Sequence, residues 1–557
     1  DTSTSSSSCT GLVMLQTVST AVSPQSFTAV SPTSTTSYCV TITDSSGAGV
    51  VTTTTTTPVT ITVNAALSAP TLSPGSETID SGQSVSFSAS WTGGTSSFTA
   101  KLDTSTLSSS CTGLIVVQTV GSASSPQAFT AVAPTSTTYY CSTITDSSGA
   151  GAVTTTTATP VVITVSSALG VPTLSPGSET IDSGQSVPFS VSWTGGTSSF
   201  TAKLDTSTSS SSCTGLVLVQ TIASASSPQA FTAVTPTSTT YYCATITDSS
   251  GAGAVTTTTT MPVTITVNAA LGAPTLSPGS ESIDSGQSVS FSASWVGGTA
   301  SFTAKLDTST SSSSCTGLAT VQTVPSATSP QAFTAFSPTS TTFYCATITD
   351  SSGAGAVTTT TASPVVITVN AALAAAVPTP TSVAIDAGQT EVLTNAATGG
   401  TSPFTWQWYD PSTSGTCSST SPAIGGATSP TYTTPNTLSA GTYYFCYRVT
   451  DSSAAGAVSV YSSTDTVVVN AALSAPTLSP GSESIDSGQS VSFSASWSGG
   501  TSSFTAKLDT STSSSSCTGL VMLQTVSTAV SPQSFTAVSP TSTTSYCVTI
   551  TDSSGAG

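Results

Sequence analysis

The spacing of the twelve cysteines constrains the fold of this chain more than any other feature. They form six successive pairs whose members lie 30 residues apart, or 29 in one pair, and the first members recur every 102 residues, or 100 in one case. A fixed period of this length indicates a tandem array of small domains. The cysteines are Cys9, Cys39, Cys111, Cys141, Cys213, Cys243, Cys315, Cys345, Cys417, Cys446, Cys517 and Cys547.

The even pairing predicts one disulfide within each repeat, from 9–39 through 517–547. Zinc is the alternative use of such cysteines, but it needs four clustered ligands and the chain contains no histidine. Disulfides persist in oxidising compartments, so we expect the chain to be extracellular, at the cell surface. Closing a loop of about 30 residues is worth about 3.6 kcal/mol in the loop-entropy model.

Short joints that resemble Asn-Ala-Ala-Leu divide the chain, at 64–67, 166–169, 268–271, 370–373 and 470–473. They predict four complete domains and a partial domain at each end. The complete domains are 65–166, 167–268, 269–370 and the divergent, Trp-rich 371–470; the C-terminal part of a domain occupies 1–64 and the N-terminal part of another occupies 471–557.

The two ends of the chain are related to each other. Residues 509–557 repeat residues 1–49 without a difference, and 471–508 followed by 1–64 would make one whole domain. We expect the sequence to be a window from a longer array with a five-domain super-period. The alternative is a subunit whose partial ends complete each other by strand exchange.

Within 65–166, alternation of apolar and hydroxyl side chains predicts strands. Val85, Phe87, Ala89 and Trp91 alternate with serine, and a Gly-Gly turn then leads into a strand that carries Lys101 on its outer face. In the order of the chain, the expected strands are 69–72, 85–91, 98–102, 114–120, 128–132, 140–145 and a last strand at 153–165, interrupted by Pro160. Short strands, frequent turns and the lack of any helical pattern predict an all-β sandwich in each domain.

Composition excludes several functions. The net charge is −18, from 23 acidic and 5 basic residues, so the basic surface that nucleic acid requires is missing. No apolar stretch is long enough for a transmembrane helix, and we expect no membrane insertion in this segment. Without histidine, no serine or cysteine nucleophile has its usual base. We therefore expect no enzyme, no cofactor and no bound metal, and any sugar to be O-linked to hydroxyl-rich runs such as 52–57.

Two segments carry a resemblance to a known group of proteins. Residues 236–248, Pro-Thr-Ser-Thr-Thr-Tyr-Tyr-Cys-Ala-Thr-Ile-Thr-Asp, and residues 399–408, Gly-Gly-Thr-Ser-Pro-Phe-Thr-Trp-Gln-Trp, resemble the immunoglobulin-like and PKD-like repeats of large archaeal and bacterial surface proteins. The resemblance implies tandem immunoglobulin-like β-sandwich domains of about 100 residues and an exterior location. It does not define one function, because such repeats serve filaments, adhesins and surface layers.

The disulfide differs from that of antibody domains, where it crosses the core. Tyr242, Ala244 and Ile246 share one face of a strand and Cys243 lies on the other, so the bridge is expected on the outer face of the sheet. Four tryptophans end the Val-Phe-Ala strands and are expected in the cores: Trp91, Trp193, Trp295 and Trp497. The divergent domain has Ala397 at that position, and Trp406 and Trp408 on the next strand predict an alternative packing or a ligand platform.

Acidic turns recur in every domain. Asp-Ser-Ser turns include Asp146 and Asp248, and Asp80 precedes a Gly-Gln turn. Each aspartate is interpreted as a cap of its own turn. Calcium between domains is the alternative, although it requires several converging carboxylates. Each regular domain also has one Glu and one Lys, Glu77 and Lys101 in the first. An isopeptide crosslink that uses them is a further hypothesis, but the predicted outward position of Lys101 disfavours it.

These observations predict a structural protein of an extracellular filament that self-associates with identical chains. The last strand of each domain, such as 50–63, is expected to be the exposed edge for these contacts. The alternative is the spacer stalk of a giant surface adhesin whose binding tip lies elsewhere. A binding role for the repeats themselves, through Trp406 and Trp408, ranks third.

Overall fold

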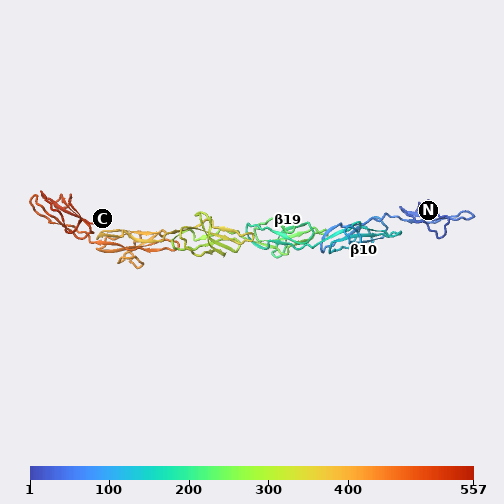
Figure 1. The fold of residues 1–557 in the computed structure, drawn as a ribbon, viewed down its shortest axis with the longest axis horizontal. Coiled ribbons are helices and arrows are strands. Elements are labelled where there is room, and N and C mark those ends of the chain that lie inside the picture. Colours follow the sequence, from blue (N-terminus) through green and yellow to red (C-terminus); the bar gives the residue numbers. More distant parts are fainter. Residues whose placement is uncertain (557) are drawn as a thin grey trace. The chain divides into compact units, whose positions relative to one another are not determined.

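The computed structural model describes residues 1–556 and confirms the all-β prediction. These residues contain 46 strands and no helix, and therefore no helix that could span a membrane. The chain divides into two compact units, residues 1–268 and 269–557, and the division falls at one of the predicted domain joints. Each domain forms its own group of strands (Figure 1).

The domain at 65–166 is a sandwich of two sheets. Three short strands form one sheet in the order β11-β8-β6, and five strands form the other in the order β10-β9-β12-β14-β7, with β13 added beside β12. The strands are β6 (Thr71–Ser73), β7 (Glu77–Asp80), β8 (Ser88–Ser90), β9 (Phe98–Ser105), β10 (Ile115–Ala123), β11 (Gln127–Ala128), β12 (Thr138–Thr145), β13 (Thr154–Thr156) and β14 (Val161–Ser166).

All pairs in this domain are antiparallel except one. Strand β7 runs parallel to β14, with Ile79 opposite Val165. The sequence did not indicate β7, because Ile79 is the one apolar residue in its four positions. The predicted exposed edge is therefore wrong for the complete domains: their last strand lies between two others, here β12 and β7. In the partial domain 1–64, the last strand, β5, pairs only with β2 among the described residues.

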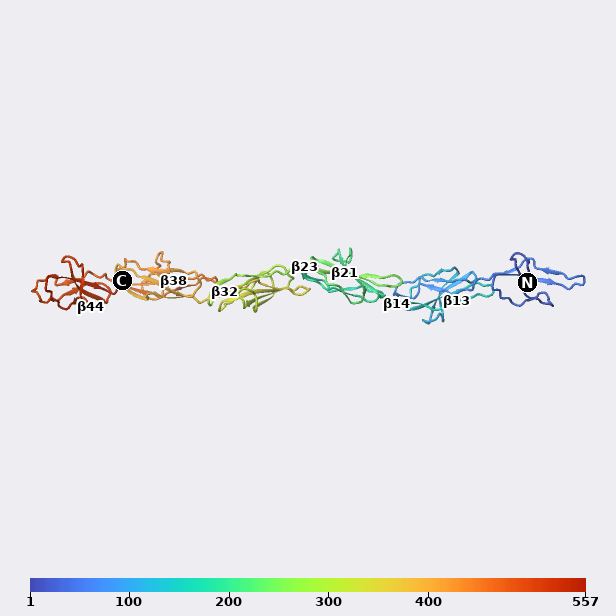
Figure 2. The same ribbon diagram turned by 90° about the horizontal axis from the view of Figure 1, so that it is seen from above.

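The next two domains repeat this arrangement. Strands β21 and β23 pair side by side within domain 167–268, as Figure 2 shows. Strands of 167–268 are β15 (Thr173–Ser175), β16 (Glu179–Asp182), β17 (Ser190–Ser192), β18 (Phe200–Ser207), β19 (Val217–Ala225), β20 (Gln229–Ala230), β21 (Thr240–Thr247), β22 (Thr256–Thr258) and β23 (Val263–Asn268). Strands of 269–370 are β24 (Thr275–Ser277), β25 (Glu281–Asp284), β26 (Ser292–Ser294), β27 (Phe302–Ser309), β28 (Ala319–Ala327), β29 (Gln331–Ala332), β30 (Thr342–Thr349), β31 (Thr358–Thr360) and β32 (Val365–Asn370).

The divergent domain lacks the outermost strand of the larger sheet, which ends at β36 in the order β34-β40-β38-β36. Its strands are β33 (Ala374–Thr379), β34 (Ser382–Asp386), β35 (Val392–Thr398), β36 (Thr405–Tyr409), β37 (Thr431–Thr433), β38 (Gly441–Thr450), β39 (Ser459–Tyr461) and β40 (Asp465–Asn470). The end segments hold β1 (Thr2–Ser3), β2 (Thr36–Tyr38), β3 (Thr41–Thr43), β4 (Thr52–Thr54) and β5 (Val59–Ile61), and β41 (Thr477–Ser479), β42 (Ser494–Ser496), β43 (Phe504–Ser511), β44 (Val521–Ala529), β45 (Gln533–Ser534) and β46 (Ser545–Thr551).

Each core lies between the two sheets, where the alternating apolar residues meet. In 65–166 the predicted inward residues, among them Phe87 and Leu102, are buried together. The four expected core tryptophans are also buried, and Trp91 packs edge-to-face on Phe98 with 5.4 Å between the ring centres. In the divergent domain Trp408 is fully buried at the centre of the core, and its Nε1–H donates to the Ser429 carbonyl over 2.9 Å.

Candidate functional site

The structure joins the cysteines in six disulfides within single repeats: Cys9–Cys39, Cys111–Cys141, Cys213–Cys243, Cys315–Cys345, Cys417–Cys446 and Cys517–Cys547. In domain 269–370, Tyr344, Ala346 and Ile348 enter the core, whereas Cys345 on the same strand is buried outside the core cluster. Its partner, Cys315, lies in the loop between β27 and β28. The bridge thus fastens this loop to the outer face of the larger sheet.

Trp406 and Trp408 do not form an exposed pair. Trp408 is 0% exposed and belongs to the core, so it cannot contact a ligand at the surface. Trp406 is half-buried and packs against the same core, and its ring centre lies 6.1 Å from that of Phe404. The two residues provide the alternative core packing, and the ligand platform is not supported by their burial.

Polar residues from the turns of successive domains form a hydrogen-bonded cluster between those domains. Within unit 1, the interpretation of Asp80 as a cap of its own turn is wrong. The Asp80 N–H donates instead to Gln83 Oε1 over 2.8 Å, and the Asp80 carboxylate accepts a 2.8 Å hydrogen bond from the hydroxyl of Thr197 in the next domain. Thr197 also donates its backbone N–H to Asp248 over 3.1 Å. One threonine therefore holds aspartates from two domains.

Asp248 does cap its own turn, as expected, because its Oδ1 accepts the N–H groups of Ser250 and Val255. That turn docks on the preceding domain. The Gly251 N–H donates to the Thr78 carbonyl on β7 over 2.8 Å, and Gln83 Nε2 donates to the Gly253 carbonyl over 2.7 Å. Ser250 completes the contact with a hydrogen bond to Gln83 Oε1, and Ala252 packs against the hydrophobic core of 65–166. From here on, the joint means this set of contacting residues and not the Asn-Ala-Ala-Leu segments: Thr78, Asp80, Gln83, Thr197, Asp248, Ser250, Gly251, Ala252 and Gly253.

Unit 2 repeats the joint twice. Thr401 donates its hydroxyl to Asp284 over 2.7 Å and its N–H to Asp451, while the Ala454 N–H donates to the Ser282 carbonyl. The joint between 371–470 and 471–557 has the same bonds. There, Thr501 binds Asp386 and Asp552, and the Gly555 N–H donates to the Ala384 carbonyl. The recurrence of these contacts shows that the joint is a property of the repeat.

Electrostatics within the joint are unusual because two acids face each other. Burial and the neighbouring Asp248 carboxyl raise the pKa of Asp80, which is 2% exposed. Asp248 is buried as well, but the hydrogen bonds it accepts lower its pKa. The Oδ2 atoms of Asp80 and Asp284 are buried without a hydrogen-bond partner. Among residues 1–556 no three acidic, cysteine or histidine side chains converge as a metal site would require.

The larger sheet of 65–166 ends at β7 on one side, where the Gly251 N–H of the next domain bonds to Thr78, and at β10 on the other. The sequence did not mark β10 as an edge. Strand β10 ends the larger sheet and pairs only with β9 among the described residues. Its first residues, Ile115, Val116 and Val117, are all exposed, Ile115 by 63%. Gln118 fixes the strand by two hydrogen bonds with the backbone of Thr130. Edge strands β19, β28 and β44 correspond to β10 in 167–268, 269–370 and 471–557, and each includes or adjoins exposed apolar residues.

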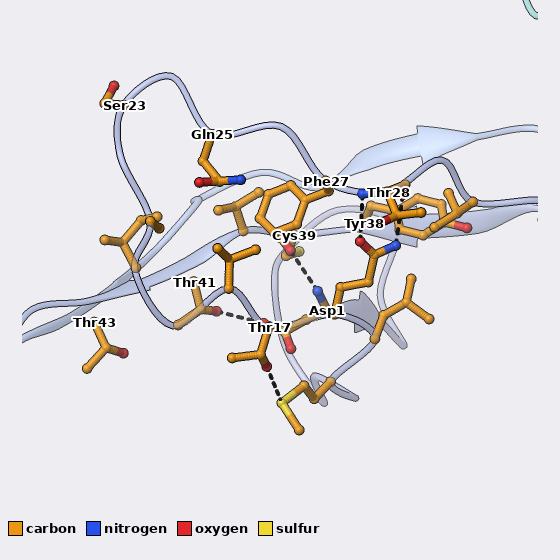
Figure 3. A pocket seen from close by; sticks show the side chains of 18 of the residues that line it. Asp1, Thr17, Ser23, Gln25, Phe27, Thr28, Tyr38, Cys39, Thr41 and Thr43 are labelled. Carbon is orange, nitrogen blue, oxygen red and sulfur yellow. Dashed lines mark hydrogen bonds between the residues drawn. The ribbon is translucent and has the colours of Figure 1, made fainter.

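A pocket in the partial domain 1–64 is an uncovered half-core (Figure 3). Phe27 and Tyr38 line it, and they correspond in the repeat to the buried Phe129 and Tyr140. Phe27 is 46% exposed, against 5% for Phe129, because the strands that cover Phe129 have no counterpart within 1–64. The pocket therefore reflects core surface that the described residues of 1–64 leave uncovered.

Comparisons with solved structures find tandem immunoglobulin-domain proteins. The match to an I-band fragment of titin covers 98% of that chain and 54% of this one, with 14% identity and a TM-score of 0.30. The match to an ICAM-5 ectodomain fragment covers 100% and 72%, with 13% identity and a TM-score of 0.32. The match to the N-terminal immunoglobulin domains of Down Syndrome Cell Adhesion Molecule covers 71% and 90%, with 12% identity and a TM-score of 0.21. No family model and no curated protein matches the chain.

Proposed function

We propose that this chain is a structural, non-enzymatic segment of an extracellular filament in which identical chains associate side by side. The observation that carries the proposal is the joint. Direct hydrogen bonds hold 65–166 against 167–268, 269–370 against 371–470, and 371–470 against 471–557, and Ala252 adds an apolar contact at the first of these joints. Such joints suit a stiff element that bears load or sets a fixed spacing.

The lateral contact is assigned to the exposed edge strands, with β10 as the type example. An unpaired edge offers a row of N–H and C=O groups to a further strand. The strand and its flanks, residues 106–135, contain no charged side chain, so two copies meet without ion repulsion at the contact. The edge recurs with the domain period, which allows several pairs to form between two parallel chains at once, and linked weak contacts add to a strong one.

Substitution of the edge tests this proposal. Val116→Lys, together with the equivalent changes Leu218→Lys, Thr320→Lys and Met522→Lys in the other regular domains, places a charge on each edge. We expect the variant chain to stay monomeric while the unmodified chain forms ordered multi-strand fibres in electron micrographs. The physical reason is that adding a strand would bury or crowd these ammonium groups.

A matched control places lysine on the middle strand of the larger sheet, on the face that points away from the core. Thr143→Lys and its equivalents Thr245→Lys, Thr347→Lys and Thr549→Lys add the same charge at the same period. This control should still form fibres. If the unmodified chain appears only as single threads at all concentrations, the filament proposal is wrong and the adhesin stalk becomes the better interpretation.

A further inference from the structure

The joint contains a buried pair of carboxyl groups for which the filament proposal gives no role. In unit 1, Thr197 donates its hydroxyl to Asp80 of one domain and its backbone N–H to Asp248 of the next, so the two carboxyl groups meet at one residue. Two carboxylates cannot form a hydrogen bond to each other unless one of them carries a proton. The Oδ2 of Asp80, which is buried without another partner, is the atom on which this proton is needed.

The surroundings of the pair favour a single negative charge. Asp248 accepts the N–H groups of Thr197, Ser250 and Val255, so it is the better-stabilised carboxylate. Asp80 accepts only the Thr197 hydroxyl and a backbone contact from Leu169. No lysine or arginine among the described residues contributes to the pKa shift of Asp80 or Asp248, so no positive charge balances a second carboxylate. The other acidic residue beside this turn is Glu77, which lies close to Gly251.

We propose that each joint is closed by a proton shared between two aspartates of successive domains, so that pH controls the docking of one domain on the next. The pairs are Asp80–Asp248, Asp284–Asp451 and Asp386–Asp552, and in each pair one threonine donates to both carboxyl groups. Glu77 is not required for this role, because its counterpart in the third pair is Val383, which lies beside Gly555 as Glu77 lies beside Gly251.

The direction of the pH effect follows from the two pKa values. Docking raises the pKa of Asp80, so at pH values above the ordinary aspartate range Asp80 takes up a proton when the domains dock. Docking therefore weakens as the pH rises through the raised pKa, because that proton is lost. Docking lowers the pKa of Asp248, so it also weakens when the pH falls far enough to protonate both acids. The joint is therefore tightest in mild acid and loosens on either side.

A calcium ion is the chemical alternative to the proton. It would need six or more oxygen ligands with several carboxylates, whereas the joint provides two carboxyl groups, and three of their four oxygens already accept N–H or O–H donors. The donors favour the proton, and the experiment below separates the two.

Hydrogen exchange of the Gly251 amide in the full chain tests the proposal, because this N–H bonds across the joint to the Thr78 carbonyl. The peptide 249–261 ends at Met261 and has no identical copy in the other repeats. Fragmentation of that peptide reports Gly251 by itself. After correction for intrinsic exchange, we expect protection to be greatest in mild acid and to fall by up to about tenfold per pH unit above the raised pKa, the limit for one proton.

Two variants at Asp80 decide the result. In Asp80→Asn the amide can donate permanently to Asp248, so protection of Gly251 should no longer fall as the pH rises above mild acid. In Asp80→Ala the joint should be weaker at every pH, again without the acid optimum. Asp284→Asn, the same change at another joint, is the matched control and should leave the Gly251 profile as in the unmodified chain.

Three outcomes would overturn the proposal. Protection of Gly251 that does not vary with pH in the unmodified chain removes the switch. A pH profile retained in both Asp80 variants assigns it to another group. Protection at pH 7.5 that is lost in EDTA and restored by calcium chloride shows that a cation, and not a proton, neutralises the pair. Each of these results leaves the filament proposal standing, because that proposal depends on the hydrogen bonds across the joint and on the edge strands, and not on how the joint responds to pH.

Discussion

Single residues in this chain take their chemistry from burial more than from their sequence neighbours. Asp465 of the divergent domain illustrates this. It stands where the regular domains have valine, such as Val365, and its side chain is 0% exposed. Neither carboxyl oxygen has a hydrogen-bond partner of ordinary geometry, although the backbone of Thr466 opposes the rise in the pKa of Asp465. Burial and the nearby charge of Glu391 raise the pKa of Asp465 to about 6.

The raised pKa predicts that domain 371–470 is more stable in acid than at neutral pH. Asp465 is protonated in the folded domain below about pH 6, and this stabilisation is lost as the pH rises through that value. The shift from an ordinary value of 3.8 corresponds to about 3 kcal/mol. Hydrogen exchange of peptides from β38, which are unique to this domain, should show deeper protection at pH 4.5 than at pH 7.5.

Asp465→Val is the informative variant because it restores the residue of the regular domains. It should raise protection at pH 7.5 and remove most of the difference between the two pH values. Val365→Thr in a regular domain provides a control that alters the same strand position without a charge. An unchanged pH difference in Asp465→Val would show that another group is responsible.

At the scale of the strand and loop, the disulfide compensates for thin packing. The loop that carries Cys213 is built from serine and threonine, and its own contacts are hydrogen bonds such as those from the Ser207 hydroxyl to the carbonyls of Ser212 and Thr214. Such hydroxyl-to-carbonyl hydrogen bonds replace similar bonds to water, so each contributes little to the net free energy of folding. The bridge to Cys243 on β21 therefore holds the loop against the sheet.

Peptide mapping without reduction should find the six bridges within single repeats, with no free thiol and no link between domains. Reduction should lower the free energy of unfolding of each complete domain by about 3.6 kcal/mol, the loop-entropy value for about 30 residues. Thermal unfolding in the presence of a reductant measures this loss, and EDTA without reductant is the control that should have little effect. A large drop in melting temperature in EDTA alone would indicate structural calcium.

At the scale of the molecule, near-identical domains present the same surface again and again. Charged residues make up 5% of the chain, and the exposed edge strands contribute none of them. Contacts between copies are therefore expected to rest on apolar and hydroxyl groups, while the net charge of −18 opposes association at long range.

Raising the salt concentration should preserve or tighten the fibres, because salt screens the repulsion beyond about 10 Å at 0.1 M and leaves apolar contacts intact. Imaging and sedimentation of the full chain across a salt series measure this. Fibres that dissolve at high salt would show that ion pairs hold the copies together, and the edge-strand contact would then be wrong.

The sequence by itself determined the features that depend on local pattern. Period-two alternation, as from Val85 to Trp91, identified core strands because one face of a strand must be apolar to pack. The cysteine period and the joint motifs predicted repeats of about 100 residues, and strand alternation at Tyr242 to Ile246 indicated the outer face for Cys243. Each of these inferences depends only on residues close together in the sequence. The structure buries Val85, Phe87, Ala89 and Trp91 in the core, as the alternation predicted.

The tertiary structure alone decided which strands are edges and which acids are shared. Strand β7 carries one apolar residue, so no periodicity indicates it, yet its parallel pairing with β14 makes β7 and β10, and not the last strand, the two ends of the sheet. Asp80 has the sequence of a turn cap, and only the docking of the next domain brings its carboxyl to Thr197 and Asp248. Contacts between residues more than a hundred positions apart leave no local pattern, because burial and pairing are set by the packed domains.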